Sequence, residues 1–577
     1  MKRLLYLFIF VFSCNTTNEK PNFNFETHFE ISNGLETATY QLTIQFYNNL
    51  AEAYPQITID SIGETDSGKP LHLVTFNVDT QFDFSEIRKN KRILFINNGI
   101  HPGESDGIDA TMLLFRDLVH GRIEPPKNTI LATIPIYNVG GSLNRNTSSR
   151  ANQNGPKAYG FRGNARNYDL NRDFIKCDTK NAETFSKIFH LVKPDVFIDT
   201  HVSNGANYQY TLTHLFTQHN KLGGDLGHYL HTEMMPKLEQ KLAEKEWDIT
   251  PYVNVFNKVP EKGFSQFMDY PRYSTGYTTL FNCLGMMVET HMLKPYEQRV
   301  EGTYELLKSM IAITEEDGET ISKIKNEQIK RLYESKTYRL LWEVDTTEIS
   351  QLNFKGYEAK TIKSDVTGFN RLKYDTNKPF IKTIKYQNYF KPTKIIEIPS
   401  AYIIPQGWHQ VINLLKLNKV EMKRFENDTI LEVEHYKITD YDTRRMAYEG
   451  HYPHYNVQIS SSLENKNFQK GDYIIHTEQE AIRYLIETLE PQAIDSFFNW
   501  NFFDTILQQK EGFSPYVWED IALELLENNP DLREAFDQRK KSDSEFNANW
   551  YAQLDWLYKQ SEYYEKAHMQ YPVYRLN

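Results

Sequence analysis

The stretch R-I-L-F-I-N-N-G-I-H-P-G-E, residues 92–104, joins a dense apolar run to a polar turn. Such a run suits a strand that is buried on both faces, as the strands of a parallel sheet are. The turn that follows places His101 and Glu104 three positions apart across a Pro-Gly pair. The carboxyl ends of strands are where open α/β sheets bind their ligands. This stretch therefore predicts both a type of sheet and the edge at which a site would lie.

Three further apolar runs repeat the pattern, at 129–137, 195–200 and 284–290. Helix-like stretches lie between them, for example at 108–119 and 183–192. Alternation of strands and helices is typical of an α/β layer fold with helices on both faces of a central sheet. We therefore predict an α/β domain over residues 24–330.

The sequence pattern changes near Tyr338. Segments such as A-K-T-I-K-S-D-V and F-I-K-T-I-K-Y alternate apolar and polar residues, which is typical of half-exposed strands. From about Thr477 onward the pattern becomes helical. We place a domain boundary within 325–345 and predict an accessory region over 331–577, mixed α/β to about 476 and then helical. No motif in this region carries a chemistry that we can assign.

Composition limits the classes of partner. The chain has 577 residues, of which 40% are apolar and 14% aromatic, so a large core is expected rather than disorder. Its net charge of −11, with no basic tract, argues against a nucleic-acid partner. Beyond Cys14, the remaining cysteines are Cys177 and Cys283, which either pair or stay buried and free. No cysteine-centred signature surrounds them, so we predict no catalytic thiol.

The first twenty residues read as an export signal. M-K-R precedes an apolar run, Leu4 to Phe12, which is too short to span a bilayer because about 20 residues are needed. V-F-S-C resembles a bacterial lipoprotein cleavage box in which Cys14 becomes the lipidated terminus, although Phe12 departs from that pattern. We predict a protein of the periplasm, outer membrane or cell surface that touches the membrane only through this anchor. An ordinary cleaved signal is the alternative.

Each of the four apolar runs ends in polar residues: His101 with Glu104, then Asn138, His201 and Glu289. The H-x-x-E motif alone is weak, since a chain with 17 histidines holds about one match by chance, and a surface turn would explain it. The four strand ends together favour a site assembled across the sheet.

Two histidines and one carboxylate form a known catalytic zinc set that leaves a position for water or substrate. His101, Glu104 and His201 would supply that set. Zinc lowers the pKa of its bound water to about 7, and a carboxylate must still accept the proton. Glu289 is the candidate base, because it ends a buried strand and is not needed as a ligand.

These residues resemble those of the zinc carboxypeptidases related to carboxypeptidase A. H-P-G-E at 101–104 is similar to the family's H-x-x-E, and R-G-N-A-R-N-Y-D-L-N-R at 162–172 is similar to its R-x-N-x-N-G-x-D-L-N-R. I-D-T-H at 198–201 resembles the segment of the third ligand, and Glu289 the catalytic glutamate. N-V-G-G at 138–141 is only partly similar to the family's N-P-D-G turn.

The resemblance covers about 60–310 and joins four separate motifs in the family's order. Arg166 and Asn167 stand where the family has Asn-Gly, a departure confined to one turn. The resemblance implies a mixed central sheet and zinc held by His101, Glu104 and His201.

The resemblance also implies roles for arginines. Arg162 would polarise the scissile carbonyl and stabilise its oxyanion, and Arg172 with Asn171 would hold the terminal carboxylate of the substrate. Arg145 and Arg150 remain rivals of Arg162 for the carbonyl. A solvated loop charge is the alternative for each arginine.

The family also uses a tyrosine from a loop before the catalytic glutamate. D-Y-P-R-Y-S-T-G-Y offers Tyr270, Tyr273 and Tyr277, of which we prefer Tyr273, although spacing does not choose among them. We expect Asp199 to orient His201 or a nearby arginine.

We therefore predict a zinc metallocarboxypeptidase that cleaves the C-terminal peptide bond of peptides with a free carboxylate. One alternative keeps this chemistry on cell-wall peptides or acylated amino acids. Another is a surface binding protein that retains the fold without turnover. The sequence leaves the oligomeric state open.

Overall fold

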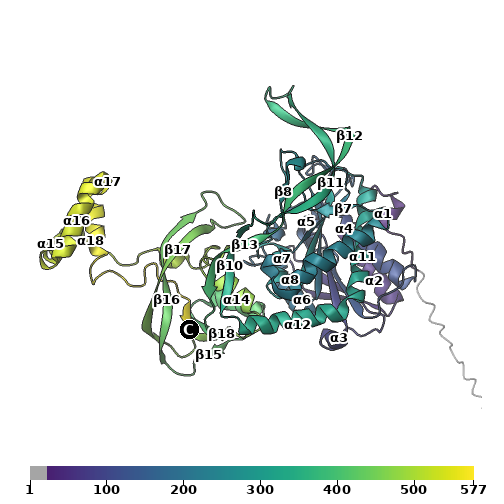
Figure 1. Ribbon diagram of the computed structural model, residues 1–577. Helices are drawn as coiled ribbons and strands as arrows, with labels where there is room; N and C mark the ends of the chain where they lie inside the picture. Colours follow the sequence, from purple (N-terminus) through teal and green to yellow (C-terminus); the bar gives the residue numbers. More distant parts are fainter. Residues whose placement is uncertain (1–22) are drawn as a thin grey trace, which may run out of the picture.

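The computed structural model describes residues 23–577 (Figure 1). Its centre is a mixed eight-stranded sheet with the strand order β1-β2-β4-β3-β5-β9-β6-β7. The strands are β1 (Ile57–Glu64), β2 (Pro70–Phe76), β3 (Arg92–Asn97), β4 (Thr129–Ile134), β5 (Val196–Ser203), β6 (Leu212–Phe216), β7 (Ile249–Pro251) and β9 (Leu284–His291).

The four predicted apolar runs form neighbouring parallel strands in the middle of this sheet. β3 pairs in parallel with β4 on one side and β5 on the other, and β5 pairs in parallel with β9. Antiparallel pairings at β1–β2, β2–β4 and β9–β6 make the sheet mixed. β4 and β5 are buried along their whole length, which explains why they are apolar without alternation.

Helices cover both faces of the sheet. β4 and β5 flank β3 on opposite sides, so right-handed crossovers put α4 (Asp106–Val119) and α6 (Lys180–Val192) on opposite faces. α11 (Tyr296–Glu316) packs beside α4, whereas α10 (Ser274–Thr279) places Tyr277 against Phe189 of α6, with ring centroids 5.4 Å apart. The predicted α/β fold is confirmed.

The remaining helices of this part are α1 (His28–Ile31), α2 (Tyr40–Ala53), α3 (Phe84–Asn90), α5 (Val139–Leu143), α7 (His219–Leu222), α8 (Gly224–Tyr229), α9 (Met235–Ala243) and α12 (Gly318–Glu334). Several of them pack beside those that cover the faces: α2 contacts α4, and α9 and α12 contact α11.

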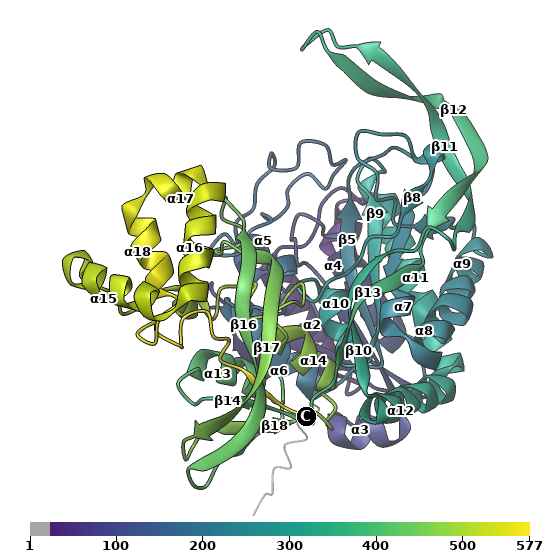
Figure 2. The same ribbon diagram turned by 60° about the vertical axis from the view of Figure 1, so that its left-hand side comes forward.

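After α12 the chain enters a strand-rich part. β10 (Thr337–Val344) pairs with β13 (Phe390–Glu397). β11 (Ser350–Lys363) and β12 (Asn370–Gln387) form a long hairpin that projects from the body, as Figure 2 shows. The base of β12 pairs with β8 (Phe264–Ser265), so one small sheet joins the strand-rich part to the first.

A six-stranded sheet follows, in the order β15-β18-β14-β19-β16-β17. Its strands are β14 (Ala401–Ile404), β15 (Lys423–Arg424), β16 (Thr429–Thr443), β17 (His454–Phe468), β18 (Tyr473–His476) and β19 (Tyr574–Leu576), and α13 (His409–Leu417) lies between β14 and β15.

Helices dominate after β18, as predicted: α14 (Ile482–Leu489), α15 (Pro515–Asn528), α16 (Pro530–Ser542), α17 (Ser544–Ala548) and α18 (Trp550–Tyr558). The last residues depart from this helical pattern. β19 is a strand because its backbone pairs with β14 and β16. α15–α18 form a lobe with a core of its own (Figure 1).

One hydrophobic core runs from the first part into the second. It contains residues of β3 and β5 together with Tyr402, Tyr484 and Trp500. The rings of Phe281 and Tyr484 stack with centroids 5.8 Å apart. The accessory region is therefore packed against the α/β part through buried side chains.

The predicted signal and the lipidation site at Cys14 lie outside the described residues. Within residues 23–577, no helix combines the length and the apolar composition that a bilayer span requires. Cys177 and Cys283 are both buried and free.

Candidate metal centre and active site

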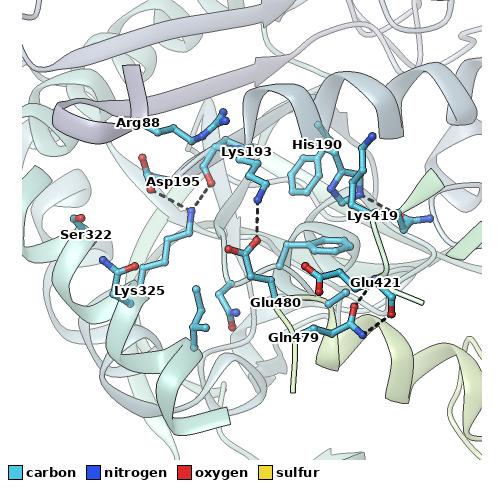
Figure 3. A pocket seen from close by; sticks show the side chains of 18 of the residues that line it. Arg88, His190, Lys193, Asp195, Ser322, Lys325, Lys419, Glu421, Gln479 and Glu480 are labelled. Atoms are coloured by element: carbon cyan, nitrogen blue, oxygen red, sulfur yellow. Dashed lines mark hydrogen bonds and ion pairs between the residues drawn. The ribbon is translucent and has the colours of Figure 1, made fainter. Parts of the chain in front are cut away.

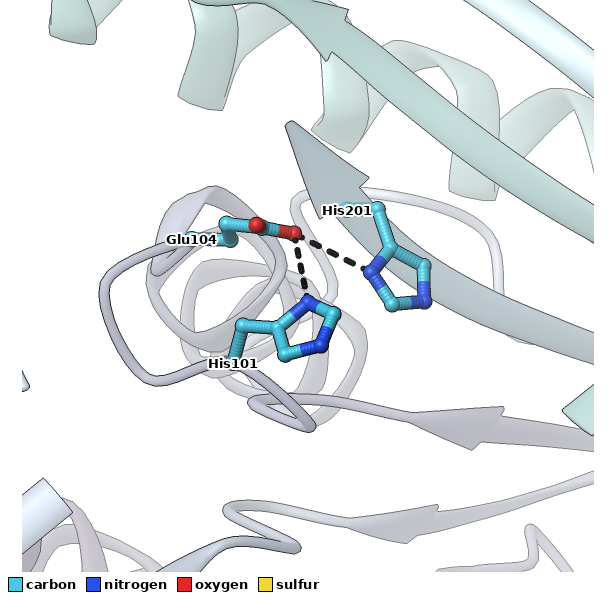
Figure 4. A group of neighbouring side chains, drawn as sticks. All are labelled: His101, Glu104 and His201. Atoms are coloured by element: carbon cyan, nitrogen blue, oxygen red, sulfur yellow. Dashed lines mark hydrogen bonds and ion pairs between the residues drawn. The ribbon is translucent and has the colours of Figure 1, made fainter. Parts of the chain in front are cut away.

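Three predicted ligands meet at the carboxyl ends of β3 and β5. The donor atoms of His101, Glu104 and His201 all lie within 4.8 Å of one another (Figure 4). Oε2 of Glu104 is 3.2 Å from Nδ1 of His101 and 3.0 Å from Nδ1 of His201. Each of the three residues is only 3% exposed. The structure thus gathers residues that are far apart in the chain into one buried cluster.

A tight turn after β3 brings two of the ligands to one side. The backbone N–H of Glu104 donates to the carbonyl of His101 at 2.7 Å. A Cβ on Gly103 would lie 2.6 Å from Nε of Arg150 and 3.0 Å from the carbonyl oxygen of Gly160. Glycine is required here because the turn packs against another loop with no room for a side chain.

The far nitrogen of each histidine is held by an aspartate. Nε2 of His101 lies 2.9 Å from Oδ1 of Asp169, and Nε2 of His201 lies 2.9 Å from Oδ2 of Asp199. A carboxylate at this position takes the N–H, which leaves the Nδ1 lone pair free to bind a metal. The sequence predicts an orienting role for Asp199, and the structure pairs it with His201. The contact of Asp169 with His101 is not predicted, although Asp169 stands inside the D-L-N-R motif.

The donor set fits a divalent cation. With Nε2 protonated on both histidines, two Nδ1 lone pairs face the carboxylate of Glu104, and such electron-rich atoms need a positive charge between them. The pKa of His201 also indicates that a positive charge is favoured here. Burial lowers the pKa of His201, but Asp199 and Glu104 outweigh it and raise the pKa well above its usual value. Two imidazoles and a carboxylate are ligands that zinc accepts.

Asp199→Asn tests the support of His201. An amide cannot hold the Nε2 proton as a carboxylate does, so we expect zinc affinity to fall about 10- to 100-fold. Competition with a chromophoric chelator measures this affinity. Asp195→Asn, at the opposite end of the same strand where Asp195 pairs with Lys325, is the matched control and should leave affinity unchanged. Equal affinities for the two variants would contradict the role of Asp199.

Glu289 lies next to His201 on the adjacent strand. β5 and β9 pair in a register that sets His201 directly opposite Glu289. No side chain among residues 23–577 donates a hydrogen bond to its carboxylate. Enclosure in the pocket raises the pKa of Glu289 to about 8, opposed by the charge of His201 and reinforced by Glu104 and Asp199. An unpartnered carboxylate with a raised pKa beside a cation site is suited to accept protons.

The three candidate arginines occupy different places. Arg162 donates to Oδ2 of Asp169 from Nε at 3.0 Å and Nη2 at 2.8 Å, and its Nη1 lies 3.6 Å from Oε1 of Glu104. Arg150 reaches the same Glu104 oxygen from Nη1 at 2.8 Å. Arg145 instead donates to the backbone carbonyls of Thr37, Ala38 and Ala158. Arg145 therefore does not contact the metal cluster, whereas Arg150 and Arg162 both line the pocket around it.

Arg172 and Tyr273 form one side of the site. The guanidinium carbon of Arg172 lies 4.7 Å from the centroid of the Tyr273 ring. Asn171 is buried beside them, and its Oδ1 accepts the backbone N–H of Ser274 at 3.3 Å. Of the two rival tyrosines, Tyr277 is fully buried, and its hydroxyl donates to Asn418 at 2.6 Å. Tyr270 does not line the pocket that contains the metal cluster.

One pocket of about 610 Å³ contains all eight predicted site residues. These are His101, Glu104, Arg162, Asn171, Arg172, His201, Tyr273 and Glu289. The rest of the lining is mixed: Leu215, Tyr252, Phe267 and Met287 are among its apolar and aromatic side chains, and Ser149, Asn152 and Asn204 are among its polar ones. The volume lies within the range usual for small-ligand sites. No sequence signal had identified these apolar residues.

A pocket of about 780 Å³ at the opposite ends of the strands has a different character (Figure 3). Two ion pairs lie in its lining: Lys193 is 2.8 Å from Glu480, and Lys325 is 3.1 Å from Asp195. It holds no metal-binding cluster. We therefore place the site at the metal centre.

Comparison with known proteins follows this geometry. Residues 43–196 match the family model described as zinc carboxypeptidase. The match bears out the predicted enzyme class, a zinc metallocarboxypeptidase. It covers about a quarter of the chain and includes His101 and Glu104 but ends before His201 and Glu289.

Two fungal proteins and one bacterial structure illustrate the likeness. The chain is 22% identical to Carboxypeptidase 2 of Trichophyton tonsurans over 433 residues, 71% of this chain and 73% of that protein. It is 20% identical to Carboxypeptidase 2 of Trichophyton rubrum over 431 residues, 70% and 72% of the two chains. A metallo-carboxypeptidase from Burkholderia cenocepacia shares 16% identity and a TM-score of 0.36, covering 48% of this chain and 68% of that one.

Proposed function

We propose that this protein is a zinc-dependent carboxypeptidase that removes the C-terminal residue of peptides. The observation that carries the proposal is the content of one pocket. It joins the triad of His101, Glu104 and His201 to an unpartnered carboxylate at Glu289 and a guanidinium at Arg172. The triad and Glu289 would activate a peptide bond, and Arg172 would recognise a free carboxylate.

His101, Glu104 and His201 would hold the metal. When bound, Zn²⁺ supplies a Lewis acid and lowers the pKa of its water to about 7. Glu289 takes the proton of the attacking water and returns it to the leaving amine. Its position opposite His201, with no side chain of residues 23–577 donating to its carboxylate, leaves it free for both transfers.

Arg162 and Arg172 would stabilise different negative charges: the carbonyl oxygen during the reaction and the terminal carboxylate. Arg162 lies beside the metal ligands, where its guanidinium stabilises the negative charge that develops on the carbonyl oxygen. Arg172, with Asn171 next to it, holds the terminal carboxylate through a guanidinium fork. The stack of Tyr273 on Arg172 keeps that fork oriented. The apolar lining, Leu215 and Met287 among it, favours an apolar terminal side chain.

Arg172→Gln tests the recognition of the carboxylate. A charge-assisted hydrogen bond is worth about 1.5–3 kcal/mol, so we expect kcat/KM on free peptides to fall about 10- to 150-fold. A peptide with an amidated C-terminus should already be a poor substrate of the wild type, and the variant should lose little more on it.

Arg166→Gln is the matched control, because Arg166 lies in the same segment but donates to the carbonyl of Asp178 outside the pocket. It should keep wild-type kinetics. Equal cleavage of free and amidated peptides by the wild type would end the claim of a carboxypeptidase.

We also propose that the protein is exported and lipid-anchored at Cys14. The support for this is the sequence of residues 1–20, a short basic start, an apolar run and a lipoprotein-like box.

A further inference from the structure

A second pocket, of about 890 Å³, adjoins the metal site. The two pockets share Phe267 and Tyr273, whose rings meet edge to face with centroids 5.1 Å apart. The far wall of the second pocket comes from the accessory region, including Arg444, Tyr448 and Trp500. The shared pair is therefore a thin partition between the metal site and a space that the accessory region builds.

The accessory wall is anchored to the catalytic part on both sides of the partition. Arg272, in the loop that carries Tyr273, places Nε 2.8 Å from Oδ1 of the buried Asp495, and its backbone N–H donates to Oδ2 at 2.9 Å. Oε2 of Glu449 accepts the backbone N–H of Asp169 at 2.8 Å. The wall is thus fixed by contacts to the residues that hold substrate and metal ligands.

Further contacts fix the tip between β16 and β17. Nε2 of His451 lies 2.8 Å from Oδ2 of Asp178, beyond the D-L-N-R motif. The rings of Tyr448 and Trp500 stack with centroids 6.1 Å apart. A wall held in this way is formed before substrate arrives, which favours binding because little ordering remains to be done.

The charge of the second pocket is positive. Arg272, Lys394 and Arg444 line it, and no aspartate or glutamate does. Asp495 neutralises Arg272, but neither Lys394 nor Arg444 forms an ion pair within residues 23–577. The guanidinium of Arg444 stacks on Tyr448 at 4.9 Å. Lys394 is also close enough to the buried Glu490 to oppose the rise of its pKa. In a chain of net charge −11, two cations in one pocket that form no ion pair indicate an anionic ligand.

We propose that the second pocket binds an acidic side chain of the substrate, so that the enzyme selects acidic peptides. This inference rests on the proposed function, because it requires one peptide substrate to occupy both pockets. The two pockets meet at Phe267 and Tyr273. Aromatic rings would pack against the peptide, and Lys394 and Arg444 would pair with its carboxylate. The terminal carboxylate stays with Arg172, on the other side of Tyr273.

Matched hexapeptides ending in leucine test the proposal. They carry Glu, Gln or Lys at the second or third position from the C-terminus. At one of these positions we expect kcat/KM to be about 10-fold higher for Glu than for Gln, and lowest for Lys, because a charge-assisted pair adds about 1.4 kcal/mol. The preference should shrink as salt rises, since the pocket is open to solvent.

The double variant Lys394→Gln, Arg444→Gln should bring the Glu-to-Gln ratio close to one. Arg445→Gln is the matched control: Arg445 neighbours Arg444 but does not line the pocket, and this variant should keep the preference. Equal rates on Glu and Gln peptides in the wild type, or a preference that survives the double variant, would overturn the proposal.

A binding measurement keeps the test independent of turnover. Fluorescence anisotropy with labelled Glu and Gln peptides on the Glu289→Gln protein should show about 10-fold tighter binding of the acidic peptide, lost when Lys394 and Arg444 are also changed. Equal binding of both peptides would refute the proposal that the second pocket binds an acidic side chain. Selective binding without cleavage by the wild type refutes only the proposed catalysis.

Discussion

Glu289→Gln should lower kcat about 10³-fold on a C-terminal peptide substrate while zinc stays bound at one equivalent. General acid–base groups contribute about 10²–10⁴-fold, and the amide can neither accept nor return a proton. Zinc should remain because Glu289 is not among the three clustered ligands. Steady-state kinetics and elemental analysis of the same preparation measure the two effects.

The control for this substitution is Glu301→Gln, the same carboxyl-to-amide change on the exposed face of α11. It should leave kcat unchanged. If Glu289→Gln retained more than about a tenth of wild-type kcat with zinc in place, another group would have to move the proton. That outcome would contradict the role of Glu289, the carboxylate that strand register sets opposite His201.

His201→Ala should remove the metal altogether. We expect zinc to fall from about one equivalent to below about 0.1, with loss of all measurable activity, because two remaining ligands rarely hold zinc against dilution. Zinc stabilises a protein that binds it only when folded, so it should raise the Tm of the wild-type apoprotein and leave the Tm of the variant unchanged.

His214→Ala provides the comparison. His214 is also buried and on a strand of the same sheet, but it contacts Glu239 at 2.9 Å and lies outside the metal cluster. This variant should keep its zinc even where its Tm falls. A His201→Ala protein with one full equivalent of zinc would show that the metal binds elsewhere.

The accessory region gains a role from these contacts. The hydrophobic core crosses from the α/β part into it, and the carboxylate of Glu449 accepts the backbone N–H of Asp169, in the segment that also carries Arg172. Arg272 beside Tyr273 is anchored on Asp495. A substrate cleft with walls from two parts of the chain can read more of a peptide than its last residue.

Local sequence was enough to predict the buried strands of the central sheet and the clustering of His101, Glu104 and His201. Apolar runs without alternation indicated strands buried on both faces, and parallel strands necessarily end at a common edge. His101, Glu104, His201 and Glu289 all follow or end such runs, so their convergence was a consequence of strand order.

Only the tertiary structure decided what depends on contacts between distant segments. Nothing in N-R-N-T-S-S-R separates Arg145 from Arg150; the loop path turns the first to backbone carbonyls and the second to Glu104. The choice of Tyr273 rests on its stack with Arg172. The second pocket had no signal in the sequence. Its walls include residues 267–273 and residues 444–500, which meet only through tertiary packing, and no local pattern records such packing.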